Sequence, residues 1–220
     1  MSREYFVSVI ERRPRLLAAV LRFNQAPPQA GSGAERSGLE AAVSRCEALR
    51  GLWPREDKAA RPFFSFEEET ERLALMSAEE LARLARLASA SVFSELIAKA
   101  VRRDEVLALR QFLGADVFEY AITLGRFQAG TLAAPLAAMT PEGERIADRA
   151  ERLSGIILAS IRGGWPAALQ ERTAALFAAT GLPVAADADA ADPLLRQRIW
   201  HFLRKILHRE FSASWANYFG

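Results

Sequence analysis

Cysteine and histidine are scarce in this sequence, and their scarcity excludes several kinds of site. A single cysteine, Cys46, among 220 residues excludes an intramolecular disulfide and any cysteine-rich metal site, and it fits a reducing compartment. The only histidines are His201 and His208, and no acidic or cysteine residue completes a set of metal ligands with them. We therefore expect no metal site and interpret both histidines as surface residues.

Charge of one sign and long apolar runs are also lacking. The 29 basic and 27 acidic residues leave a net charge of +2, too small for a bulk argument that favours nucleic acid or membranes. The longest candidate membrane stretch, 130–139, is about half of the roughly 20 residues that a spanning helix needs. The apolar stretch at 6–10 is too short for a signal peptide, and its charges lie on the wrong side. The sequence thus predicts a soluble, cytoplasmic protein without membrane insertion.

Helical periodicity dominates the sequence from Ser77 onward. Ser77 and Glu80 have the spacing of a capping box, in which each side chain accepts a hydrogen bond from the other residue's backbone N–H. An apolar stripe follows at helical spacing: Leu81, Leu84, Ala88, Val92 and Leu96. No segment alternates apolar and polar residues with β-branched enrichment. The sequence therefore predicts an all-α fold, with a compact multi-helix core domain at 77–220 after an irregular N-terminal third at 1–76.

Caps and breakers divide the predicted core domain into helices. Gly114 closes the helix that ends in Leu113, because glycine adopts the left-handed conformation after a helix without steric cost. Cap residues or first-turn prolines mark the expected helix starts: Asp116, Thr140-Pro141, Trp165-Pro166 and Asp192-Pro193. Glycines mark the later stops: Gly163-Gly164 and Gly181. The last helix is expected to reach at least Phe211.

The N-terminal third has a different composition. It starts with a short predicted helix, and residues 26–38 then hold two prolines and three glycines without an apolar period, which predicts a flexible loop. Residues 53–66 combine helix-breaking prolines with aromatic residues that favour burial: Trp53, Phe63, Phe64 and Phe66. We expect an irregular segment that these aromatic residues pack onto the core. A solvated linker is predicted at 183–192.

Catalytic motifs are absent from the sequence. The glycine pairs at 31–33 and 163–164 lack the lysine or third glycine of a phosphate-binding loop. The glutamates at 67–71 are adjacent on one element, whereas catalytic carboxylates usually face each other across a cleft. We interpret them as water-facing charges that a helix N-terminus stabilises. The sequence therefore predicts no enzyme, no cofactor and no small-molecule substrate.

The last predicted helix carries two apolar stripes and a basic face. Its core stripe follows helical spacing: Leu195, Ile199, Phe202, Leu203 and Ile206. A second stripe lies about 100° away: Trp200, Leu207 and Phe211. Residues 193–220 contain five basic residues and one acidic residue, a local charge of +4. We expect the N-terminal aromatic residues to cover Trp200, and Phe211 to be partly exposed.

The basic face of this helix is compatible with several roles. It fits a core helix with one solvated face, docking on an acidic protein surface, binding of nucleic acid, or adsorption to an anionic membrane. For docking, the candidate partner-binding residues are Arg198, Lys205, His208, Arg209 and Phe211. Aromatic side chains ringed by basic charge are common at interface hot spots.

The order of motifs resembles the K component (SctK/YscK family) of the bacterial type III secretion sorting platform. The similarity covers roughly residues 75–211. Its motifs are a leucine-rich helix, a second helix closing in a Leu-Gly pair, a later apolar helix, and a basic-apolar C-terminal helix. In this sequence they lie at 81–87 with 96–97, 109–114, 155–166 and 198–207.

This resemblance implies a non-enzymatic cytoplasmic adaptor at the cytoplasmic face of the inner-membrane secretion apparatus. Such proteins link the cytoplasmic domain of ring protein D to the pods of the Q component, and through the pods to the stalk and the ATPase. Nucleic acid is not among the partners that the resemblance implies. The alternative is a nucleic-acid-binding helical regulator that uses the basic C-terminal helix, whose binding would weaken by orders of magnitude between about 50 and 200 mM salt.

Overall fold

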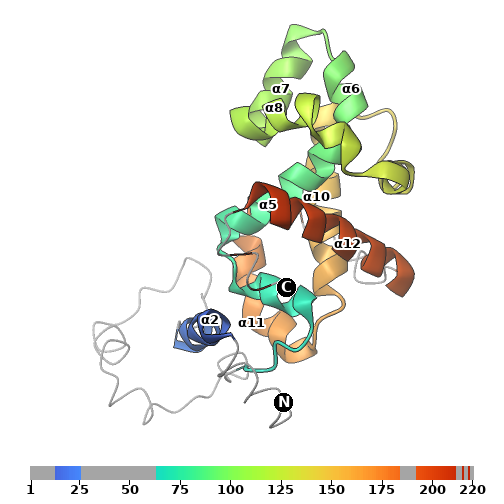
Figure 1. Ribbon diagram of the computed structural model, residues 1–220. Coiled ribbons are helices and arrows are strands. Elements are labelled where there is room, and N and C mark those ends of the chain that lie inside the picture. Colours follow the sequence, from blue (N-terminus) through green and yellow to red (C-terminus); the bar gives the residue numbers. More distant parts are fainter. Residues whose placement is uncertain (1–12, 26–62, 184–191, 212–214, 216–217, 219–220) are drawn as a thin grey trace.

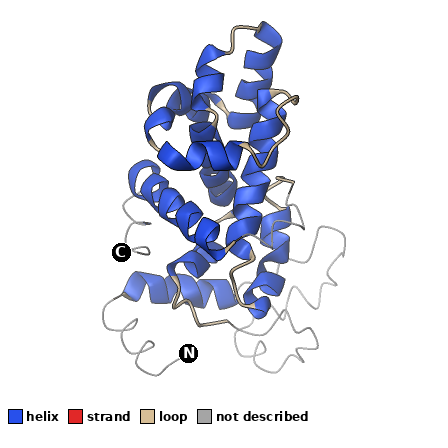
Figure 2. Ribbon diagram, turned by 90° about the vertical axis from the view of Figure 1, so that its right-hand side faces the viewer, coloured by secondary structure: helices blue, strands red, loops and turns tan. Residues whose placement is uncertain are grey.

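The structure, a computed structural model, describes residues 13–25, 63–183, 192–211, 215 and 218. These residues include no strand (Figure 2), and the predicted all-α fold is confirmed. The helices of the described ranges are, in chain order, α2 (Pro14–Gln25), η2 (Glu69–Leu75), α5 (Ala78–Val92), α6 (Ser94–Lys99), α7 (Arg103–Leu113), α8 (Ala115–Thr123), η3 (Gly125–Phe127), η4 (Gly130–Leu132), α9 (Ala133–Ala137), α10 (Ile146–Arg162), α11 (Ala167–Ala178) and α12 (Pro193–Glu210). The elements labelled η are 3-10 helices.

The pair formed by α5 and α10 is the centre of the molecule (Figure 1). The apolar stripes of both helices are buried here, and Leu84 and Ile157 have an exposed fraction of 0%. Small residues let the helices approach each other: Ser154 Oγ lies 2.9 Å from Ser89 Oγ and 3.3 Å from the Ala85 carbonyl oxygen. Since burial of one large aliphatic side chain stabilises a fold by about 1.5–3 kcal/mol, this interface is the main apolar core.

The predicted capping box forms at the start of α5, but the predicted stripe ends early. The Ser77 N–H donates to Glu80 Oε2 at 2.9 Å, and the Glu80 N–H donates to Ser77 Oγ at 3.2 Å. Phe93 leaves the helical conformation, with φ −95° and ψ 10°, and the chain restarts as α6. This break rotates the following residues about the helix axis. Leu96, predicted on the buried stripe, is therefore exposed.

Helices α6, α7 and α8 pack together at one end of the molecule, at the top of Figure 1. Gly114 joins α7 to α8 with a φ of +82°, in the region that favours glycine, which confirms the predicted helix stop. Asp116 does not cap α8, contrary to the prediction, because Gly114 holds the N-cap position. The Asp116 carboxylate instead accepts a hydrogen bond from Arg83 Nε of α5 at 3.3 Å. A charged partner on another helix thus replaces local capping.

Helix α10 begins at Ile146, and the prediction of a start at Thr140-Pro141 is wrong. The Thr140 hydroxyl donates to the Ala137 carbonyl at 2.8 Å and accepts a hydrogen bond from Arg149 Nε at 3.2 Å. These bonds tie Thr140 to the end of α9 and to the side of α10. Its hydroxyl is therefore not available as a helix cap at this position.

The predicted starts of the last two helices, α11 and α12, are confirmed. α11 begins directly after Trp165-Pro166, and Gly181 beyond its end has a φ of +69°. Asp192 caps α12 through Oδ1, which accepts a hydrogen bond from the Leu194 N–H at 3.1 Å. α12 ends at Glu210 with Phe211 as its C-cap, and the helix lies across α5 and α10 (Figure 1).

α2 and η2 lie at the end opposite α6–α8, beside α11 (Figure 1). Residues 63–68 are irregular, as predicted, and the ring of Phe66 packs edge-to-face against Phe63 and Phe23 with centroids 5.1 and 5.5 Å apart. Phe64 is exposed, and the prediction that it packs onto the core is wrong. A tight turn, in which the Phe66 N–H donates to the Phe64 carbonyl at 3.2 Å, separates the exposed Phe64 from the buried Phe66. The predictions for the loop at 26–38, Cys46, Trp53 and positions 184–191 lie outside the described residues.

Candidate functional site

α12 presents the exposed basic face that the sequence predicts. Arg198, His201, Lys205, His208 and Arg209 are all exposed to solvent. At 100° per residue, positions 198, 205 and 209 lie within about 40° of one another around the helix axis, and they span about 16 Å along it. We call Arg198, Lys205 and Arg209 the basic stripe.

The other two cations of α12 are used inside the fold. Arg196 Nε donates to the Ser160 carbonyl of α10 at 2.9 Å, and Arg204 forms an ion pair with Glu69 of η2 at 3.4 Å. Within the part of the chain that the structure describes, Arg209 is the one member of the basic stripe with an ion pair, a 3.6 Å contact to Glu210. Such an exposed pair is worth at most about 1 kcal/mol, so the charge of the stripe is available to a partner.

The opposite face of α12 belongs to the core. Trp200 and Leu207 are buried on this helix, which packs on α5 and α10. Among the N-terminal aromatic residues, Phe66 packs with Phe23 of α2. Phe211 is half-buried, as predicted, because the guanidinium carbon of Arg83 lies 5.2 Å from the centre of its ring. Phe211 thus takes part in packing within the fold, whereas the cations of the basic stripe are exposed.

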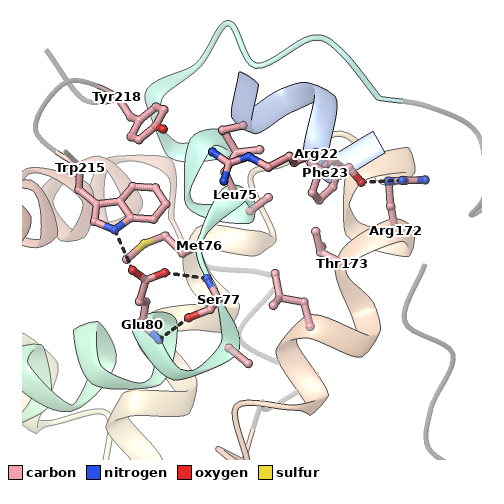
Figure 3. Close-up of a pocket in the computed structure, with 14 residues that line it drawn as sticks. Arg22, Phe23, Leu75, Met76, Ser77, Glu80, Arg172, Thr173, Trp215 and Tyr218 are labelled. Atoms are coloured by element: carbon pink, nitrogen blue, oxygen red, sulfur yellow. Dashed lines mark hydrogen bonds between the residues drawn. The ribbon is translucent and has the colours of Figure 1, made fainter. Parts of the chain in front are cut away.

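A cavity of about 500 Å³ lies at the end of the molecule that contains α2 and η2 (Figure 3). Its walls come from four separate segments of the chain: α2, the stretch from η2 into α5, α11, and the C-terminal Trp215 and Tyr218. Apolar side chains form much of the lining, among them Phe23, Leu75 and Leu176. This volume falls in the range of roughly 300–1,000 Å³ that is typical of ligand pockets.

Glu80 is the carboxylate of the cavity wall, and both of its oxygens are engaged. Oε2 accepts a hydrogen bond from the Ser77 N–H at 2.9 Å, within the capping box. Oε1 accepts a hydrogen bond from Trp215 Nε1 at 2.8 Å (Figure 3). Glu80 therefore ties Trp215 to the start of α5, with one hydrogen bond accepted by each of its oxygens.

Two arginines line the same cavity in different situations. Arg172 is buried; its guanidinium carbon lies 4.9 Å from the ring centre of Phe23, and Nη2 donates to the Phe23 carbonyl at 2.9 Å. Arg22, in the last turn of α2, is exposed. In Figure 3 its side chain extends from α2 toward the side of the cavity where Trp215 and Tyr218 lie. None of the ion pairs among the described residues involves Arg22.

The glutamates at 67–71, interpreted as water-facing charges, differ in burial: Glu67 and Glu68 are exposed, as predicted, whereas Glu71 is buried in η2, and for this residue the interpretation is wrong. Its exposed fraction is 7%, because its Oε2 turns back to accept a hydrogen bond from the Glu68 N–H at 3.2 Å. Burial raises the pKa of Glu71 to about 7, against the opposing effect of that backbone hydrogen bond. Glu71 does not line the cavity.

Within residues 13–25, 63–183 and 192–211, with Trp215 and Tyr218, no group of three or more His, Cys, Asp and Glu could hold a metal ion. No helix of these ranges is long and apolar enough to cross a membrane. No protein-family model, curated protein or solved structure matches the chain. The fold and the site thus define an all-α protein with an exposed basic stripe and a separate cavity.

Sequence reasoning placed the basic stripe but missed the cavity. The stripe follows from helical spacing within one element, whereas the cavity walls lie as far apart in sequence as Ala19 and Tyr218. The one usable signal was the pair of aromatic residues Trp215 and Tyr218, which follow the last helix without a stripe to join.

Proposed function

We propose that this protein is a non-enzymatic helical adaptor that docks on acidic protein surfaces through the basic stripe of α12. The observation that carries the proposal is that the cations of this helix fall into two groups, one bonded inside the fold and one exposed. Arg196 and Arg204 bond inside the fold, while Arg198, Lys205 and Arg209 face solvent. A rigid helix that presents cations at fixed spacing favours a complementary acidic surface and accelerates encounter with it.

The finer assignment is the K component of a type III secretion sorting platform. The order of sequence motifs at 81–114, 155–166 and 198–207 supports it, and an all-α fold is compatible with it. In this proposal, one surface of the protein binds the cytoplasmic domain of ring protein D and another binds the Q-component pods, at the cytoplasmic face of the inner membrane. Its mechanism is positional, because it holds two other components at a fixed separation.

Charge reversal on the basic stripe tests the docking proposal. We expect Arg198→Glu combined with Lys205→Glu and Arg209→Glu to weaken binding to the ring domain or to the pod protein at least tenfold, measured by biolayer interferometry. Because all three side chains are exposed, the thermal midpoint and the helical circular-dichroism signal should change little.

The matched control reverses the same number of charges at the other end of the molecule. Lys99→Glu, Arg103→Glu and Arg126→Glu are exposed positions on α6, α7 and η3. This control should bind both partners like the wild type. Failure of the wild type to bind either partner would refute the finer assignment, and an equal loss in both triple variants would show that the stripe is not the specific contact.

Nucleic acid is the second candidate, because guanidinium and ammonium groups on one helix face also suit phosphates. Binding that neutralises several phosphates falls by orders of magnitude between about 50 and 200 mM salt. We expect no retention of a labelled duplex or single strand at about 50 mM salt. Retention that the stripe variant abolishes would favour the nucleic-acid function over the adaptor.

A further inference from the structure

The cavity combines an apolar interior with a cation, Arg22, that forms no ion pair with any acidic residue in the described ranges. Phe23, Leu75 and Leu176 offer apolar surface, and a volume of about 500 Å³ is large enough for a bulky side chain. Apolar surface of this kind is stabilised when another apolar group removes it from water. The interior therefore favours an aromatic or branched aliphatic group.

The polar groups around this interior select the charge of the occupant. Both oxygens of Glu80 already accept a hydrogen bond, from Ser77 and Trp215, and the buried Arg172 is held against Phe23. Among the described residues, the Arg22 guanidinium donates one hydrogen bond, from Nε to the Ala18 carbonyl at 3.3 Å, and its two terminal nitrogens remain as donors. A guanidinium presents paired donors that match the two oxygens of a carboxylate. An apolar group beside a carboxylate thus satisfies both parts of the cavity.

The cavity also lies close along the chain to the basic stripe. Trp215, in the cavity wall, follows Arg209, the last member of the stripe, by six positions in the sequence. An extended chain of that length spans at most about 20 Å. A partner segment of ordinary length can therefore contact both the stripe and the cavity, which a free small molecule cannot do.

We propose that the cavity receives an apolar side chain from an acidic segment of a protein partner, and that a carboxylate next to that side chain pairs with Arg22. This inference rests on the proposed adaptor function and specifies its partner: a segment in which acidic residues flank a large apolar residue. The apolar residue anchors in the cavity, and the acidic flank extends toward the basic stripe.

A synthetic probe tests the cavity without any assumption about the natural partner. The probe is a short capped peptide in which glutamates flank a leucine and a phenylalanine, and its control carries glutamine in place of every glutamate. Binding to the full chain is followed by nuclear magnetic resonance at the indole N–H of Trp215, which Trp215→Phe identifies among the four tryptophans. We expect the glutamate peptide to shift this resonance and to bind at least tenfold more tightly than the control.

Two variants place the probe in the cavity. Arg22 is exposed, so Arg22→Glu should not disturb folding. It should lower the affinity for the glutamate peptide at least tenfold and leave the affinity for the glutamine peptide unchanged. Ala19→Trp should fill the cavity from α2 and weaken both peptides, with an unchanged thermal midpoint as the check on folding. If Ala19→Trp fails to fold, Leu176→Phe adds bulk from α11 instead.

The possible outcomes separate this inference from the proposed function. The inference is overturned if the glutamate peptide does not shift the Trp215 indole resonance at millimolar concentration. It is also overturned if Arg22→Glu does not lower the affinity for this peptide. Tighter binding of dodecanoate than of the peptide also overturns it, in favour of a free amphiphile. If Arg22→Glu keeps full affinity for the ring and pod proteins while the stripe variant loses it, the inference fails and the adaptor function stands. If the peptide behaves as expected but neither natural partner binds, the adaptor function fails.

Discussion

At the α5–α10 pair, apolar side chains meet between two regular helices whose backbone groups are already paired. In the η2 region, residues 63–76, the chain is irregular or 3-10 helical, and many of its backbone carbonyls need partners from elsewhere. Arg72 binds two of these carbonyls: its Nε donates to the Phe66 carbonyl at 3.2 Å and its Nη2 to the Glu67 carbonyl at 3.1 Å. Its Nη1 donates to the carbonyl of Tyr218, near the C-terminus, at 2.7 Å. One buried guanidinium thus does for this region what the helical ladder does for the centre.

Asn24 of α2 performs a similar task for Phe63. Its side-chain amide donates to the Phe63 carbonyl and its oxygen accepts a hydrogen bond from the Phe63 N–H, both at 2.7 Å. An apolar interface tolerates small shifts because its attraction has no direction, whereas a hydrogen bond weakens steeply with angle and distance. The comparison teaches that the centre supplies stability, while the η2 region uses directed bonds to fix the walls of the cavity.

Truncation at the centre is expected to have the largest effect on stability. Leu84→Ala removes a fully buried side chain of α5 and leaves a void, which should cost about 2–5 kcal/mol of unfolding free energy. Urea denaturation measures this loss. Leu107→Ala, at a position 56% exposed on α7, is the control and should change stability by less than about 0.5 kcal/mol.

Loss of the Arg72 bonds should destabilise the η2 region in particular. Arg72→Met keeps the apolar stem but leaves three carbonyls without their donor, which should cost about 2 kcal/mol or more. Hydrogen exchange should show the greatest loss of protection at 66–76, with α10 protected to nearly the global limit. Arg152→Met, which breaks an exposed ion pair with Glu144, should cost at most about 1 kcal/mol. Uniform loss of protection would show that the two regions do not open separately.

The buried carboxyl of Glu71 should make stability depend on pH. Its pKa is about 7 in the folded protein and near 4.5 when unfolded, so between these values the folded state binds more protons than the unfolded state. Stability should therefore fall as the pH rises from about 4.5 to 7, by up to about 1.4 kcal/mol for each unit of pKa shift, and change little above that range.

Glu71→Gln should remove this dependence, because glutamine cannot ionise. The variant should exceed the wild type in unfolding free energy at pH 8 and approach it at pH 5, measured by urea denaturation at each pH. Glu79→Gln, at an exposed position in the first turn of α5, should leave the slope of the wild type intact. An identical pH profile in Glu71→Gln would contradict the raised pKa.

The smallest effect is expected at the capping box. Ser77→Ala removes the acceptor of the Glu80 N–H and should cost about 1 kcal/mol by thermal denaturation. Because Glu80 also holds Trp215, the variant should in addition loosen the cavity wall, visible as a shift of the Trp215 indole resonance. Thr123→Ala, which removes an exposed hydroxyl bonded within its own helix, should change neither quantity appreciably.

The sequence by itself determined the features that depend on near neighbours. The start of α5 at Ser77, the stop at Gly114 and the cap of α12 at Asp192 are all decided within a few residues, by backbone groups that need a local partner. The basic stripe was predictable for the same reason, because one helix fixes the spacing of its own side chains.

Only the tertiary structure decided where distant polar groups would meet. Thr140 accepts a hydrogen bond from Arg149, and Asp116 accepts one from Arg83. Neither residue therefore caps the helix that its local sequence pattern indicated. Arg72 reaches a carbonyl 146 positions away, and the cavity exists because α2, η2, α11 and the C-terminal aromatic residues converge. Many residues could satisfy a buried polar group, and the packing of the helices selects which of them comes within hydrogen-bonding distance.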